Sequence, residues 1–188
     1  IMRNILVSVA LLALGLLLLP VLAQRDALAG SARILAPVYF SSLGLAYLFI
    51  EVWLLRRFAM YLGHETHGLS VVLATLLVSS GLGSFASPHL LQVPRARALL
   101  GCGATILLLV LASYHLATLT EVTWSLSLLG RMSVSIACVA PLGFCMGFAM
   151  PAGLDWARAT HPGSVPFCIG INGFASVIAT IAVLPISL

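Results

Sequence analysis

Six apolar stretches, almost without charge, constrain this chain more than any other feature. They cover residues 5–23, 34–55, 69–87, 98–119, 132–150 and 165–188, and Glu51 is the only formal charge within them. A hydrocarbon core is ~30 Å thick and a helix rises ~1.5 Å per residue, so ~20 apolar residues can cross it. Because lipid offers no partners to backbone amides, each stretch is expected to be helical. The sequence therefore predicts an all-α fold, a polytopic integral membrane bundle of about six transmembrane helices in one domain.

Composition excludes several other classes of protein. Hydrophobic residues make up 61% of the chain and charged residues 7%, against ~25% charged in soluble domains. The net charge of +4 comes from arginines that flank the apolar stretches, and the chain has no lysine. Arginines at helix ends suit lipid headgroups better than a nucleic-acid groove. We therefore expect a lipid bilayer as the surroundings of the chain, and no nucleic-acid partner.

The first stretch has two interpretations. Arg3, the leucine-rich run and Ala23 before Gln24 are similar to a secretory signal peptide. The run is long for a signal core of ~7–15 residues, so a retained helix is favoured. With six spans, four arginines would lie on the amino-terminal side and five on the other. This near balance leaves the topology open, because the positive-inside rule needs a clear asymmetry.

Small residues indicate close helix packing. Six glycines recur at short spacing within the predicted spans, where a missing side chain lets two helices approach each other. They are Gly81, Gly83, Gly143, Gly147, Gly170 and Gly173. Pro141 removes one backbone hydrogen bond in the fifth stretch, and we expect it to kink that helix.

Glu51 is the most informative single polar residue. A carboxylate in the centre of a bilayer costs ~2.5–3.5 kcal/mol on insertion scales and normally faces a partner or a polar cavity. It is either a proton or cation site or a structural partner of another helix, and Arg56 and Arg57 follow it closely. Asn172 in the sixth stretch must also find a partner, in a neighbouring helix or in a polar pocket.

No pattern predicts a metal site, a cofactor or a catalytic group. In His64-Glu65-Thr66-His67 only one residue separates Glu65 from His67, so the metalloprotease pattern H-E-x-x-H is not met. The four cysteines lie inside apolar stretches, where thiols behave as small hydrophobic groups. We therefore do not expect an enzyme.

Two parts of the chain have a familiar pattern. The first comprises residues 41–51, Arg57, 62–64, 69–73 and 80–84, and the second 141–144, Gly147, 151–153 and 170–177. Together they resemble the membrane portion of bacterial spermidine-synthase-like integral membrane proteins. The resemblance implies a bacterial inner membrane, and it puts Glu51, Arg57, His64 and Asn172 on the family's recurring polar positions. These four residues are therefore the candidates for a ligand site or an ion pair.

The resemblance also implies membrane helices joined to a soluble aminopropyltransferase-like Rossmann domain. The chain has no Rossmann segment, so we do not carry the synthase activity over to it. Glu65 and His67 stand where the family more usually has proline and an aromatic residue. These two departures count against a ligand role for that loop.

Two functions fit these observations. The leading hypothesis is a non-catalytic membrane subunit that packs into, or stabilises, a larger membrane protein assembly with other membrane subunits as its partners. The alternative is a small cation or polyamine transporter-like module with Glu51 and Asn172 in its pathway.

Overall fold

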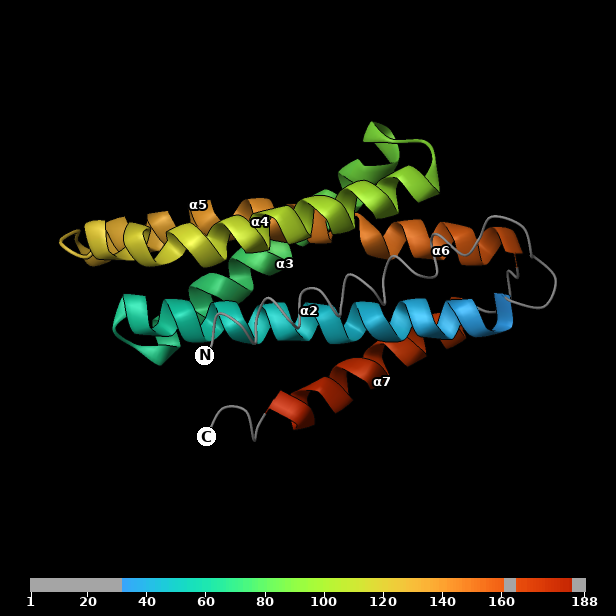
Figure 1. Ribbon diagram of the computed structural model, residues 1–188, viewed down its shortest axis with the longest axis horizontal. Helices are drawn as coiled ribbons and strands as arrows, with labels where there is room; N and C mark the ends of the chain where they lie inside the picture. Colours follow the sequence, from blue (N-terminus) through green and yellow to red (C-terminus); the bar gives the residue numbers. More distant parts are fainter. Residues whose placement is uncertain (1–31, 161–164, 184–188) are drawn as a thin grey trace.

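The computed structural model describes residues 32–160 and 165–183, and within these ranges every regular element is a helix. The helices are α2 (Ala32–Leu62), α3 (Glu65–Leu90), α4 (Pro94–Val122), α5 (Leu128–Met146), α6 (Ala149–Thr160) and α7 (Val165–Val183). Successive long helices run in opposite directions along the long axis of the molecule, and α6 continues the direction of α5 (Figure 1). The all-α expectation is confirmed for these residues.

Four segments are long and apolar enough to cross a membrane. They are Leu35–Leu62, Glu65–Leu90, Pro94–Val122 and Leu128–Ala159. The predicted stretch 5–23 lies outside the described residues, and α7 contributes a shorter apolar segment, Cys168–Val177. The described structure thus gives four candidate spans, and the count of about six is not confirmed.

Helices α2, α3 and α4 extend beyond the expected stretches at both ends, and the links between them are correspondingly short. Helix α2 continues through the Arg56–Arg57 pair and ends at Leu62. Gly63 follows in the left-handed conformation (φ 79°), and its N–H donates to the Ala59 carbonyl over 3.1 Å. Glycine is favoured at such a helix end because it has no Cβ to clash. The local stop is therefore the glycine and not the charged pair.

The expected link 151–164 is largely helical. Residues 149–160 form α6, so α5 and α6 together make one candidate span. Pro151 lies in the first turn of α6, where its missing N–H removes no helical hydrogen bond. Helix α5 itself continues through Pro141. Proline in this segment therefore does not mark a helix end.

The core has two parts, one towards each end of the bundle. The first gathers α2, α3, α4 and α5 around the fully buried side chains of Phe58, Tyr61, Val72 and Val139. The second gathers α2, α4, α6 and α7 around side chains that include Tyr39, Phe40 and Cys168. The second core carries the cavity described next.

Candidate functional site

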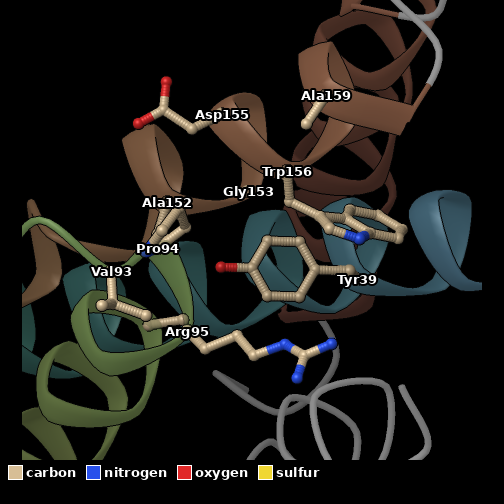
Figure 2. Close-up of a pocket in the computed structure, with 10 residues that line it drawn as sticks. Tyr39, Val93, Pro94, Arg95, Ala152, Gly153, Asp155, Trp156 and Ala159 are labelled. Carbon is tan, nitrogen blue, oxygen red and sulfur yellow. The ribbon is translucent and has the colours of Figure 1, made fainter. Parts of the chain in front are cut away.

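A cavity of about 360 Å³ lies at the end of the bundle where α4 begins and α6 ends. It is walled by side chains from α2, α4 and α6, with Val93 just before α4 (Figure 2). The lining residues are Tyr39, Val93, Pro94, Arg95, Ala98, Ala152, Gly153, Asp155, Trp156 and Ala159. Most of this wall is apolar or aromatic, and among the described residues that line it only Arg95 and Asp155 are charged.

Tyr39 is held in this wall by the junction between α5 and α6. Its hydroxyl donates to the Ala149 carbonyl over 2.7 Å. Eight residues further along α2, the Tyr47 hydroxyl donates to the Met146 carbonyl. These two bonds attach α2 to the last residue of α5 and the first residue of α6. The Tyr39 ring also packs edge-to-face on Phe40, so its position in the wall is fixed.

Gly153 allows α6 to approach this tyrosine. A Cβ at this position would collide with the edge of the Tyr39 ring. The same lack of a side chain leaves room for the cavity beside Ala152 and Trp156. The wall between α2 and α6 therefore depends on a small residue at this point.

An ionic cluster lies behind one wall of the cavity. The Arg97 side chain is only 4% exposed, and its Nη2 donates to Asp155 Oδ2 over 2.6 Å. Arg158 reaches the other carboxylate oxygen of Asp155 over 3.4 Å. In Figure 2 the Asp155 carboxylate points away from the Tyr39 ring. The cluster therefore joins the start of α4 to α6, at the edge of the cavity.

The Arg97 guanidinium is not fully satisfied by this pair. Its Nε and Nη1 atoms are buried and have no hydrogen-bond partner among the residues that the structure describes. A guanidinium carries five N–H donors, and burying unpaired donors of a charged group is costly. Two buried donors of Arg97 thus lack an acceptor among the described residues.

Glu51 lies deep within its helix. It is 11 residues before the end of α2, which corresponds to ~16 Å of helical rise. The side chain is half-buried and forms no hydrogen bond or ion pair with another described residue. Arg57, also half-buried, lies nearer to the end of the same helix. The structure thus does not join these two predicted site residues as an ion pair.

Asn172 lies where α7 crosses α2. A Cβ on Gly44 of α2 would collide with the Asn172 carbonyl and would lie 2.9 Å from Ser176 Oγ. Ser176 Oγ donates to the Asn172 carbonyl over 3.0 Å and lies 3.3 Å from the Gly44 carbonyl. Glu51 is seven residues beyond Gly44, about 10 Å along the helix. Asn172 thus takes part in a helix crossing two turns away from Glu51.

His64 lies in the two-residue turn between α2 and α3. It is exposed, and its ring packs on that of His67 with 5.6 Å between the centroids. Nδ1 of His67 is buried without a hydrogen-bond partner in the described part of the chain. Over the same residues, no group of three or more histidine, cysteine, aspartate or glutamate side chains could hold a metal ion.

The six predicted packing glycines have different surroundings. A Cβ on Gly83 would collide with the Phe144 carbonyl, one on Gly143 with Ser79 Oγ, and one on Gly147 with the Ser80 carbonyl. These three contacts join α3 to the end of α5. No described atom lies within 4 Å of the Cβ position at the other three, Gly81, Gly170 and Gly173.

The residues of the cavity were not predicted from the sequence. Arg97 and Asp155 are 58 residues apart, and Tyr39 is 110 residues from Ala149. No spacing rule connects positions so distant. One signal was present, since Asp155 is a carboxylate in a segment that carries Trp156 and Arg158 at a membrane boundary.

Comparison with protein-family models, with curated proteins and with solved structures finds no match. The resemblance to spermidine-synthase-like membrane proteins thus stays a prediction from the quoted residues.

Proposed function

We propose that this chain is a non-catalytic integral membrane subunit that packs into, or stabilises, a larger membrane protein assembly. One observation carries the membrane part of this proposal. Large apolar side chains point outward along α3 and α4, and Leu77 and Phe85 are 72% and 75% exposed. Soluble monomers rarely expose apolar patches this extensive. Lipid tails or other membrane helices are their natural surroundings.

The distribution of charge along the helices also supports insertion in a bilayer. Most described charged side chains lie within the first or last turns of the spans. The start of α4 and the end of α6 lie at one end of the bundle (Figure 1), and these segments carry Arg95, Arg97 and Arg158. Glu65 begins α3, Glu121 is near the end of α4 and Arg131 is near the start of α5, and these helix ends lie at the other end of the bundle. Headgroups and water at the two faces solvate such groups, whereas the hydrocarbon core does not.

Two features favour an assembly over an isolated subunit. The half-buried carboxylate of Glu51 lies mid-span, where a hydrogen-bond donor from another helix would offset its cost. Gly170 and Gly173 leave a smooth strip on α7 next to the exposed Phe174. Small residues beside large ones allow a further helix to pack closely in lipid.

The test is co-purification. The full chain, tagged and expressed in its own membranes, is extracted in mild detergent and examined on native gels with mass spectrometry. We expect a complex larger than the chain, and Glu51→Gln should lower the recovery of its partners. Glu121→Gln removes an exposed charge at the end of α4 and serves as the control. Migration of the wild-type chain alone, with lipid only, would contradict the assembly.

Glu51 also supports a second candidate, passage of a cation or polyamine. An intramembrane carboxylate is a frequent part of ion and proton pathways. In vesicles reconstituted with the purified chain, this candidate expects uptake of spermidine or of a monovalent cation that Glu51→Gln abolishes. Equal uptake in vesicles with and without protein would exclude it.

A further inference from the structure

We propose that a second hollow, where α2 meets α3, binds a zwitterionic phospholipid whose headgroup ends in a primary ammonium group, as in phosphatidylethanolamine. The phosphate lies beside Arg56 and the ammonium beside Glu65. The inference rests on the proposed membrane insertion and adds a ligand to it. It follows from the lining of the hollow, its unpaired charges and their order along the membrane normal.

The hollow lies at the end of the bundle opposite to the cavity beside Tyr39 (Figure 1). It has a volume of about 640 Å³, within the ~300–1,000 Å³ that is usual for ligand pockets. The two helices touch at Ala59, since a Cβ on Gly68 would lie 2.6 Å from Ala59 Cα. No described atom lies within 4 Å of the Cβ position at Gly63, so the hollow is open at the turn. The described lining residues are Leu55, Arg56, Ala59, Met60, Gly63, Glu65 and Leu69.

Two charges of opposite sign line this hollow without pairing. Arg56 and Glu65 are both exposed. Neither side chain forms an ion pair or a hydrogen bond with another residue in the described part of the chain. A guanidinium binds phosphate well, and a carboxylate accepts charge-assisted hydrogen bonds from an ammonium. The hollow therefore complements a ligand that carries both signs.

The order of these charges along the membrane normal matches a phospholipid headgroup. The span Leu35–Leu62 has 28 residues and is ~42 Å long, which exceeds a ~30 Å hydrocarbon core by ~6 Å at each end. Arg56 lies six residues before the end of α2, near this boundary, and its long side chain can extend towards the headgroups. Glu65 follows the turn and lies further out. In phosphatidylethanolamine the phosphate is bonded to the glycerol, and the ammonium lies beyond it at the end of a short carbon chain.

The same arrangement discriminates against two other lipids. Phosphatidylcholine carries the same charges, but its quaternary ammonium has no N–H to donate to Glu65. Phosphatidylglycerol has no cation, so its negative charge would face an unpaired carboxylate. Met60 and Leu69 are 58% and 52% exposed, and they offer apolar contact to the glycerol and the first methylene groups of the acyl chains.

The test measures lipid binding to the full chain in mild detergent by native mass spectrometry. The probes are the dioleoyl forms of phosphatidylethanolamine, phosphatidylcholine and phosphatidylglycerol, and glycerophosphoethanolamine, which lacks acyl chains. We expect phosphatidylethanolamine to bind at least about fivefold more tightly than either other lipid, as for one exposed charge pair. Glycerophosphoethanolamine should not compete at equal concentration, because apolar contact is part of the binding. Its competition would identify a site for a soluble headgroup and overturn the lipid proposal.

Five variants locate the binding. Glu65→Gln should lower the affinity for phosphatidylethanolamine to that for phosphatidylcholine, and Arg56→Gln should weaken both. The double variant Arg56→Glu/Glu65→Arg keeps both charges but reverses their depth, so the preference for phosphatidylethanolamine should be lost. Two controls remove exposed charges outside the hollow and should preserve it, Glu121→Gln at the same end of the bundle and Arg158→Gln at the other.

Equal effects of Glu65→Gln and Glu121→Gln would reduce the preference to general surface charge and overturn the site. A preference that survives in the double variant would contradict the match in depth. Circular dichroism melting in the same detergent shows that the variants are folded. The two proposals fail in different ways, because alkaline extraction from membranes tests insertion without reference to lipid type. A chain that stays in the membrane but shows no lipid preference would overturn the lipid site alone.

Discussion

At the scale of single residues, the contacts between helices depend on where a Cβ is missing. Gly83, Gly143 and Gly147 bring α3 and α5 within contact of each other's backbone or short side chains. The hydrophobic effect adds little to the attraction between helices in a bilayer, because the lipid tails are as apolar as leucine. Close van der Waals contact is therefore the main attraction.

Gly83→Ala tests this point with one methyl group. The added Cβ would collide with the Phe144 carbonyl, which cannot rotate away as a side chain can. We expect a loss of about 1–3 kcal/mol in unfolding free energy, as in other overpacked sites. Gly81→Ala is the matched control, since no described atom lies near its Cβ position and alanine favours helix. Unfolding is followed in detergent, and equal melting of the two variants would contradict the contact.

Tyr61 provides a second test, at the other end of the bundle. Its hydroxyl lies 2.6 Å from Thr123 Oγ1, and Arg131 donates to the Tyr61 carbonyl over 3.2 Å. Tyr61→Phe removes the first bond and should cost about 0.5–1.5 kcal/mol. Tyr114→Phe alters an exposed tyrosine and should change stability little. A larger effect in Tyr114→Phe, measured by thermal melting, would disprove this role.

The sequence predicted that glycines would mediate packing, but not which ones. Gly81 and Gly83 are two residues apart, yet only Gly83 faces a neighbour. Positions two residues apart on a helix point in directions that differ by ~200°. Which of the two glycines faces the neighbouring helix therefore depends on how the helix is rotated about its axis. A stretch that is apolar on all sides has no amphipathic pattern from which this rotation could be predicted. The Arg97–Asp155 pair was not predicted for a related reason, because it depends on which helices are neighbours.

At the scale of elements, the sequence predicted where helices are but not where they end. The expected limits followed the fall in hydropathy, whereas the observed limits follow local backbone chemistry. Gly63 ends α2, Pro94 begins α4, and Ser127 accepts a hydrogen bond from the Gly130 N–H at the start of α5. Arginine is a good helix former, so Arg56 and Arg57 lie inside a helix.

The crossing of α2 and α7 yields an element-scale prediction. Gly44→Ile would push the branched side chain into the Asn172 carbonyl and Ser176 of α7. We expect α7 to separate from α2, with faster tryptic cleavage after the exposed Arg158 and little loss of helix content. Gly103→Ile makes the same change at an open position of α4 and controls for helix propensity. Equal cleavage rates in the two variants would exclude a role for this crossing.

At the scale of the whole molecule, the alternating helices bring distant segments to the same end. The turn 91–93 and the end of α6 lie at one end, and the turns 63–64 and 123–127 lie at the other (Figure 1). Four candidate spans thus connect two sets of exposed links. This arrangement predicts which links share a side of the membrane, whereas the nearly equal numbers of arginines on the two sides did not.

Single cysteines in these links report which side of the membrane each one faces. With Cys102, Cys138, Cys145 and Cys168 replaced by serine or alanine, a membrane-impermeant maleimide should label Gln92→Cys from one side of the membrane only. It should label His64→Cys and Ser125→Cys from the other side, because α3 and α4 each cross once between them. Leu107→Cys, outward-facing at mid-span, should stay unlabelled since thiolates do not form in lipid. Labelling of Gln92→Cys and His64→Cys from the same side would mean that α3 does not cross the membrane, and the bundle would then have to lie along its surface.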